Sequence, residues 1–218
     1  MDYEMKVKNR RKEADSESRD WWDMVYTMGM PTLYILGLIM GIVGAICMGT
    51  ITRYWSELTT PTCFLYSQTA SHSIFYHFGS SLSVCNWVTY GATTGLLLAV
   101  ICGIYYAIKV RGRDEVDLPV TLVTAGIILA TLLLLAASCT LAEGMRITCA
   151  SMGLNSANNK GSSCYNKLDT RVMNYNLPIQ TSTMVRISMY SMWGSTAIFF
   201  CVTYFHLAEH YRRIRLSD

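Results

Sequence analysis

The chain has 218 residues, of which 51% are hydrophobic and only 15% are charged, and its formal net charge is +3. A water-soluble domain of this length usually carries nearer a quarter charged residues, so the composition argues against an ordinary soluble fold. The charges are also clustered, which leaves long neutral runs typical of a membrane protein. We therefore expect membrane lipid around the chain and no nucleic-acid partner.

The first 20 residues mix both signs of charge and contain few large apolar side chains, which predicts a disordered cytosolic tail. Residues 21–29 follow as an interfacial segment, in which Trp21, Trp22 and Tyr26 are expected to anchor the chain at the membrane surface. Binding of a partner through these aromatic residues is the alternative. The long charged stretch and the lack of a small-residue cleavage site predict that the first apolar run is retained and is not a signal peptide.

Four apolar runs are long enough to cross a bilayer, which takes about 20 apolar residues in a helix. Hydroxyl residues such as Ser188 and Ser195 make the fourth run the weakest. The expected fold is an all-α membrane protein: a four-transmembrane-helix bundle with small disulfide-braced extracellular loops. The predicted transmembrane helices cover residues 30–52, 87–108, 118–142 and 187–208.

The distribution of Lys and Arg predicts the orientation of these helices. Twelve of them lie on the side of the two termini, and six lie on the other side. Because positive charge favours the cytosolic side, both termini are expected in the cytosol, at the plasma membrane or an endomembrane. Residues 53–86 and 143–186 then form extracellular loops, whereas residues 109–117 and 209–218 form a cytosolic loop and tail.

The chain contains eight cysteines, and each predicted helix holds one of them. The other four, Cys63, Cys85, Cys149 and Cys164, lie in or at the edges of the loops assigned to the outside. Disulfides persist in oxidising compartments, which agrees with this orientation. Four cysteines allow three pairings. We favour Cys63–Cys85 and Cys149–Cys164, because each pair closes a short local loop; some free thiols are the alternative.

Small residues recur at every fourth position along the first two predicted helices, and residues four apart share one helix face. Such small-residue ridges let two helices approach closely in lipid. The simplest prediction is that the ridges pack on each other, with Gly41 facing Gly95. The alternative is that one ridge faces a different protein. The predicted packing residues are Gly37, Gly41, Ala45 and Gly49 on the first helix and Gly91, Gly95, Ala99 and Gly103 on the second.

The cores of the four runs contain no charged side chain. Glu143, Arg146, His206 and Glu209 lie at helix ends, where snorkelling or capping explains them. Ionisable groups inside a membrane usually mark an ion or substrate route, so a self-contained pump or carrier is not expected. A pore formed by several copies of the chain remains an alternative.

Motifs for enzymatic chemistry are also missing from the sequence. It contains no Walker-type loop, zinc-protease motif or nucleophile elbow, so we expect no catalytic residue and no cofactor. His72 and His77 could form a metal cluster with loop cysteines. Because cysteines in an oxidising loop are more often disulfide-bonded, we predict no metal site.

Several features together resemble the transmembrane protein 179 family of tetraspan membrane proteins. "CFLYSQ" begins at Cys63, and Cys85 stands just before the second predicted helix. "RITCASM" follows the third helix, and the fourth reads "MYSMWGSTAIFFCVTYFHLAEHYR". The resemblance covers about residues 53–213 in layout and implies four helices with cytosolic ends. The long charged tail at the start of this chain departs from that family.

Claudins and the auxiliary proteins of AMPA receptors share the four-helix layout as an architectural analogue, although their Gly-Leu-Trp-x-x-Cys-x-Cys run is missing here. By this analogy, we expect a non-enzymatic tetraspan protein that acts as an auxiliary or interaction subunit of a larger membrane complex, such as an ion channel or receptor. A homo-oligomeric channel or a claudin-like cell-junction protein is the alternative.

Overall fold

The computed structural model describes residues 28–58, 62–66, 80–111, 120–151, 164 and 180–217. The predicted interfacial anchors Trp21, Trp22 and Tyr26 lie outside the described residues. So do His72 and His77 of the first loop.

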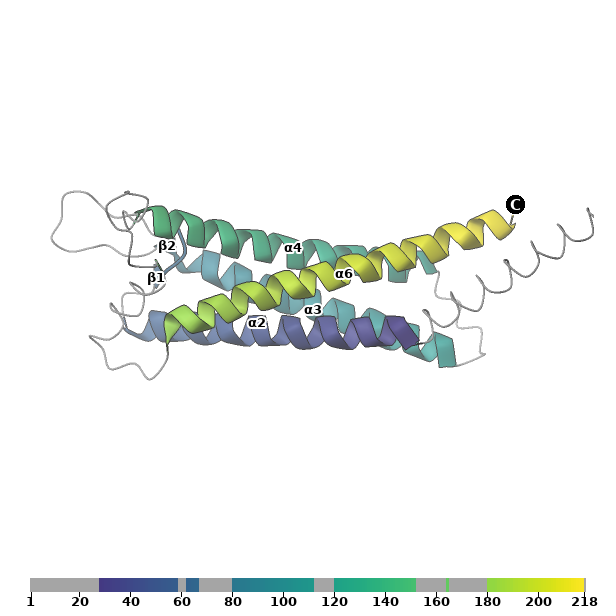
Figure 1. Ribbon diagram of the computed structural model, residues 1–218, viewed down its shortest axis with the longest axis horizontal. Coiled ribbons are helices and arrows are strands. Elements are labelled where there is room, and N and C mark those ends of the chain that lie inside the picture. Colours follow the sequence, from purple (N-terminus) through teal and green to yellow (C-terminus); the bar gives the residue numbers. More distant parts are fainter. Residues whose placement is uncertain are drawn as a thin grey trace, which may run out of the picture.

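The described residues form four long α-helices, and all four contain a predicted apolar run (Figure 1). Most helices extend well beyond the predicted limits, because their polar ends continue the helical hydrogen bonding on one or both sides of the apolar run. Two short strands, β1 (Thr62–Cys63) and β2 (Ser80–Ser81), pair antiparallel between the first two helices. The helices are α2 (Met30–Leu58), α3 (Leu82–Arg111), α4 (Val120–Ser151) and α6 (Thr181–Ser217).

The helices form an antiparallel bundle in which each helix packs mainly against two neighbours. The contacting pairs are α2 with α3, α3 with α4, α4 with α6, and α6 with α2, and the last of these is the most extensive. Figure 1 shows α6 running obliquely across α2 and α4. We call the end with the strands and bridges the disulfide end, and the end where α2 begins and α6 finishes the tail end.

The buried residues of α4 show how these helices pack. Ile127, Ala130, Leu134, Ala137 and Leu141 are all buried, at alternating steps of three and four residues. A repeat of about 3.5 residues is the pattern of left-handed helix packing, in which side chains of one helix fill spaces on the next. The core is therefore a continuous seam along the bundle.

Local signals explain where two helices begin. Pro31 stands in the first turn of α2, where its missing N–H costs no helical hydrogen bond. At α3, the Ser83 N–H donates to the Ser81 hydroxyl oxygen at 3.3 Å, so Ser81 caps the helix. Because β2 ends at Ser81, the strand leads directly into the helix.

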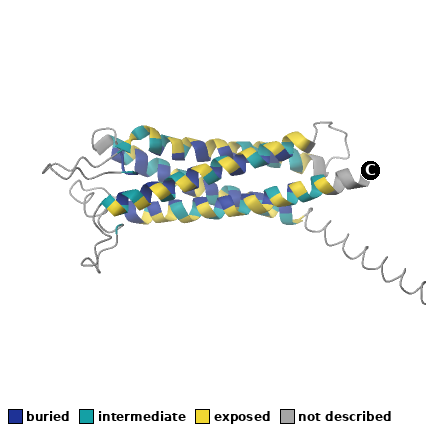
Figure 2. Ribbon diagram, turned by 90° about the horizontal axis from the view of Figure 1, so that it is seen from above, coloured by how far each residue is buried: buried dark blue, intermediate teal, exposed yellow. Residues whose placement is uncertain are grey.

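Three helices are long and apolar enough to cross a membrane: α2 over Met30–Ser56, α3 over Leu82–Ile108 and α4 over Thr121–Ser151. Among the described helices, α6 does not reach that level of hydropathy. Exposed residues lie along the outward faces of the helices (Figure 2), and many are large and apolar. Faces of this kind suit lipid and would aggregate in water.

Candidate interaction surface

The contact between α2 and α6 is built from glycines on one helix and serines on the other. The Ser188 hydroxyl donates to the Gly44 carbonyl oxygen at 2.9 Å, and the Ser195 hydroxyl donates to the Gly37 carbonyl oxygen at 2.8 Å. Both pairs of residues are seven apart, so they recur on the same face after two turns. We call this contact the glycine–serine seam.

Gly44 brings α2 close to the α6 backbone in the glycine–serine seam. A Cβ atom at Gly44 would lie 2.7 Å from the Met192 Cγ atom and 3.3 Å from the Ser188 carbonyl oxygen. Only glycine leaves room for that backbone. Close backbone contact with hydroxyl-to-carbonyl bonds is how helices associate in lipid, where no hydrophobic effect drives them together.

A second polar contact joins α6 to α4. The Thr203 and Thr131 hydroxyls lie 2.9 Å apart, and the Thr196 and Ser138 hydroxyls lie 3.0 Å apart. These pairs also recur after seven residues on each helix. The polar residues that dilute the apolar character of α6 therefore face inward, and these hydroxyls have partners inside the bundle.

The predicted packing of the two small-residue ridges on each other is wrong. A Cβ atom at Gly95 would lie 3.1 Å from the Ala130 carbonyl oxygen, so Gly95 faces α4. Gly41 lies against the side chains of Leu96 on α3 and Ser195 on α6. The small residues do permit close packing, but they accommodate different neighbours and do not meet each other.

The other ridge residues show the same division. Gly37 packs against Phe199 of α6, whereas Gly103 packs against Tyr34 of α2, each with a Cβ-equivalent distance of 3.1 Å. Ala99 is fully buried, and Ala45 lines a groove. A Cβ atom at Gly49 would have only Thr89 nearby, and the nearest atoms to one at Gly91 would belong to Trp87 of its own helix.

That groove lies between α2 and α3 and has a volume of about 270 Å³. Ala45 of α2 and Thr93 of α3 are among its lining residues, and their small side chains leave the space unfilled. The Thr93 hydroxyl donates to the Thr89 carbonyl oxygen of its own helix at 2.8 Å, so it bonds no group across the groove. The lining is otherwise apolar: Leu38, Ile42 and Ile46 of α2, and Leu96, Leu97 and Val100 of α3.

The disulfide end is closed by the segment that begins with β1. The structure joins Cys63 to Cys85 and Cys149 to Cys164, which are the pairings favoured from the sequence. The first bridge ties β1 to α3, and Phe64 and Leu65 after it are fully buried. This segment therefore fills the space between the helices at that end.

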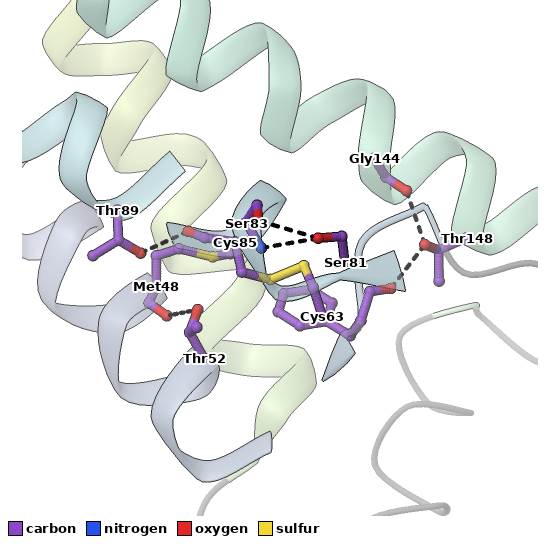
Figure 3. Close-up of a disulfide and its surroundings, with 10 residues drawn as sticks. Met48, Thr52, Cys63, Ser81, Ser83, Cys85, Thr89, Gly144 and Thr148 are labelled. Carbon is purple, nitrogen blue, oxygen red and sulfur yellow. Dashed lines mark hydrogen bonds between the residues drawn. A yellow bond between two sulfur atoms is a disulfide. The ribbon is translucent and has the colours of Figure 1, made fainter. Parts of the chain in front are cut away.

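Contacts with α4 hold the same segment in place (Figure 3). The Thr148 hydroxyl lies 2.9 Å from both the Phe64 and the Gly144 carbonyl oxygens. The Tyr66 N–H donates to the Gly144 carbonyl oxygen at 3.2 Å. Tyr66 adopts a φ of 56°, a left-handed conformation that turns the chain back toward α4.

Aromatic side chains fill the tail end between α2, α3 and α6. The Tyr34 hydroxyl lies 2.8 Å from the Nε2 atom of His206, and both residues are buried. The Tyr106 ring stacks with Tyr34 and meets the His206 ring edge-on at 5.2 Å. His206 is thus a buried hydrogen-bonding partner, which corrects its interpretation as a snorkelling or capping residue at a helix end.

Charged chemistry is sparse in the described part of the chain. Arg146 and Glu143 form an exposed ion pair on α4, with Nη2 to Oε1 and Nε to Oε2 distances of 2.6 and 2.7 Å. Within the described residues, no three His, Cys, Asp or Glu side chains come close enough together to hold a metal ion. His72 and His77, the alternative metal cluster considered from the sequence, lie outside the described residues.

Sequence reasoning missed Gly44, Ser188 and Ser195 as the residues of the main helix contact. The sequence did contain a signal for this contact, because Gly37 and Gly44 are seven residues apart and so are the two serines. Trp193 of α6 points outward, with 42% of its surface exposed. What remains available for recognition is the outward surface of the helices, since the interior side chains already bond and pack against one another.

Comparison with known proteins agrees with this architecture. No curated protein and no solved structure matches the chain. The family described as Transmembrane protein 179/179B Claudin domain matches residues 27–218, which include all four helices and both bridges. With its long apolar helices, paired cysteines and closed four-helix bundle, the chain belongs to the transmembrane protein 179/179B claudin-domain family of multi-pass membrane proteins.

Proposed function

We propose that the chain is a non-enzymatic, four-span interaction subunit of a larger membrane complex, such as an ion channel or receptor. The observation that carries this proposal is the contrast between the inside and the outside of the bundle. Inside, the seam hydroxyls bond to one another or to backbone carbonyls, and both ends are filled by side chains. Outside, the helices expose large apolar residues to their surroundings.

The fourth span in this proposal is α6. Its mean hydropathy is lowered by hydroxyl residues that face the bundle, whereas Tyr190, Trp193, Phe200, Tyr204 and Tyr211 are exposed on its outward side. Amphipathic aromatic residues favour the two membrane interfaces. Tyr190 and Tyr211 are 21 residues apart, or about 31 Å along a helix, which matches a hydrocarbon core of about 30 Å.

The proposed orientation places the disulfide end outside the cell or in the lumen. Both bridges lie at that end, and disulfides persist in oxidising compartments. Twelve Lys and Arg residues belong to the tails and the loop at the opposite end, which favours the cytosol for both termini. The plasma membrane and endomembranes both satisfy this arrangement.

The family description favours one alternative function. Because it contains a claudin domain, a homo-oligomeric channel or a claudin-like junction protein is the second candidate. In that case the outward faces would bind further copies of this chain, and several copies would surround any path. The two candidates differ in whether an unrelated protein is needed.

Purification of the tagged full chain from native membranes, followed by mass spectrometry and reconstitution in vesicles, separates these functions. An interaction subunit is expected to co-purify with a larger membrane protein in a fixed molar ratio and to carry no current alone. A current that exceeds that of protein-free vesicles, from preparations containing this chain only, would support the channel alternative instead.

A matched set of outward substitutions then identifies the binding face. Ile39, Ile101, Leu132 and Phe200 are exposed residues, one on each of the four helices. Each is replaced by Ala, and delivery to the cell surface is measured as the control for folding. The proposal predicts that one variant reaches the surface normally but loses its partner. Partner capture that survives all four changes would count against binding through the membrane-embedded faces.

A further inference from the structure

The groove between α2 and α3 is recessed between large side chains. Ile42, Ile46 and Leu97 line it and are exposed on the outside of the bundle, so they form its rim. Leu96, which is only 5% exposed, and the half-buried Ala45 form its floor. The groove is therefore open to the surroundings of the bundle, but its floor lies below the level of the neighbouring side chains.

The depth of the groove follows from its place along the two helices. The middle residues of the membrane-crossing parts of α2 and α3 are Val43 and Gly95. The lining residues lie within 38–46 on α2 and 93–100 on α3, so none is more than about 7.5 Å from the middle along the helix axis. Half of a hydrocarbon core measures about 15 Å. The groove therefore faces hydrocarbon, and neither headgroups nor bulk water reach it.

The groove is also displaced toward the tail end of the bundle. Because α2 and α3 run in opposite directions, Leu38 and Val100 both mark its limit on that side, five residues from the middle of each helix. Its other limit, at Ile46 and Thr93, lies only two or three residues beyond the middle. Acyl chains of each leaflet end near the middle of the bilayer, so the groove is level with the chain ends of the leaflet on the tail side.

Depth, size and shape together select an alkyl chain as the occupant. A dry apolar cavity of about 150 Å³ can hold benzene, and this groove has a volume of about 270 Å³. A helix is about 10 Å across, so the isoleucines at the rim keep another helix away from the floor at Ala45. The Thr93 hydroxyl already donates to the Thr89 carbonyl oxygen, so the lining offers no side-chain donor to water or to the hydroxyl group of a sterol.

We propose that this groove holds the terminal part of one phospholipid acyl chain from the leaflet on the tail side. The chain enters from the open side and lies against Leu96 and Ala45, between the side chains of the rim. It touches protein beneath and on both flanks, whereas lipid at an open helix face touches protein on one side only, so more dispersion contacts hold it in place. This occupancy requires only that α2 and α3 cross the membrane, and it does not depend on the interaction-subunit function.

Photolabelling of the purified full chain tests this occupancy. The protein is reconstituted in phosphatidylcholine vesicles that contain a trace of phosphatidylcholine with a diazirine near the terminal methyl group of one acyl chain, and labelled residues are mapped by mass spectrometry. Leu132 of α4 is the reference, because it is exposed and its neighbour Leu133 packs against Gly95, at the same depth. Labelling in the groove should exceed that at Leu132 by about fivefold, the ratio given by about 1 kcal/mol of additional contact energy. Equal labelling would overturn the proposal.

Matched substitutions separate the groove from the rest of the lipid-facing surface. Ala45→Leu fills the groove from α2 and Thr93→Leu fills it from α3, so in each variant labelling of Leu96 should fall to the level at Leu132. Ala136→Leu adds the same atoms on the exposed side of α4 and should leave labelling of the groove unchanged. Unfolding by SDS is measured for each variant as the folding control. Groove labelling that persists in a folded filling variant would contradict the proposed site.

The position of the diazirine distinguishes a chain end from other occupants. The same phospholipid with its diazirine close to the glycerol group should not label the groove above the level at Leu132, because that part of the chain lies near the headgroups. A photoreactive sterol is the third probe and should label the groove less than the chain-end probe does. Stronger labelling by the sterol, or groove labelling by the glycerol-side probe, would overturn the proposed occupant. All of these measurements use the chain alone, so their outcome is independent of whether it has a larger membrane partner.

Discussion

The two sides of α2 use small residues in different ways. Toward α6, Gly44 brings two backbones together, and serines from the other helix bond to the exposed carbonyls. Toward α3, Ala45 lines an unfilled groove, and Thr93 bonds only within its own helix. The contrast indicates that small residues allow close approach in lipid, whereas hydroxyl donors on the opposite helix hold the contact together.

Gly44→Leu should disrupt the close contact between α2 and α6 and have the largest effect of the changes considered. The new side chain would collide with Met192 and with the α6 backbone. Overpacking typically costs 1–3 kcal/mol, so we expect a loss of about 3 kcal/mol in the free energy of unfolding. Denaturation by SDS in mixed micelles measures this change.

Gly49→Leu is the matched control for that experiment. A Cβ atom at Gly49 meets only the Thr89 Cγ2 atom, at 3.4 Å. We expect a much smaller loss, within about 1 kcal/mol. Equal losses in the two variants would show that α2 is packed as tightly against α3 at Gly49 as against α6 at Gly44.

Removing the serine hydroxyls of α6 tests the hydrogen bonds that hold α6 against α2. Ser188→Ala and Ser195→Ala should each cost about 1 kcal/mol, the net contribution of a typical intramolecular hydrogen bond. The sites lie about 10 Å apart on α6, so the double variant should lose the sum of the two. Thr93→Ala is the control, because the Thr93 hydroxyl lies at the groove between α2 and α3 and bonds only within its own helix.

The contact between α6 and α4 should be less sensitive to the same kind of change. In Ser138→Ala, Thr196 loses one partner, but its hydroxyl keeps the 2.8 Å bond to the Met192 carbonyl oxygen. We expect a loss of about 0.6 kcal/mol, as for the average polar contact between membrane helices. A loss larger than that of Ser195→Ala would reverse the assigned order of the two polar contacts.

Ala45→Leu should have the smallest effect, and its sign should differ from that of Gly44→Leu next to it. The longer side chain would enter the groove between α2 and α3, so we expect unchanged stability or a gain of about 0.5 kcal/mol. The same unfolding measurement applies. A loss beyond about 1 kcal/mol would mean that the groove is not available to a side chain of this size.

The sequence predicted the four helices well, because long apolar runs have few alternative conformations in lipid. Their ends were less accessible: α6 begins at Thr181 and continues to Ser217, well past the limits of its apolar run. The two bridges followed from local spacing within each loop. Features that depend on one segment and its immediate neighbours were therefore predictable.

The choice of neighbour between helices was harder to predict. A glycine at every fourth position indicates that another helix approaches closely. The spacing of Gly37 and Gly41 does not identify which helix that is. Pairing seven-residue repeats on two helices, Gly37 and Gly44 with Ser188 and Ser195, would have identified α6. In the sequence those serines only lower the apolar character of the fourth run, whereas in the structure they supply its hydrogen bonds to α2.

In the proposed four-span arrangement, the inward hydroxyls of α6 also affect how the chain enters a membrane during synthesis. Ser188 and Ser195 bond to α2, and Thr196 and Thr203 bond to α4, both of which precede α6 in the chain. An isolated α6 would expose these groups to hydrocarbon, which is costly. We therefore expect α6 to insert only by docking on helices already in place. Damage to α2 would then leave α6 outside the bilayer and change the number of membrane crossings.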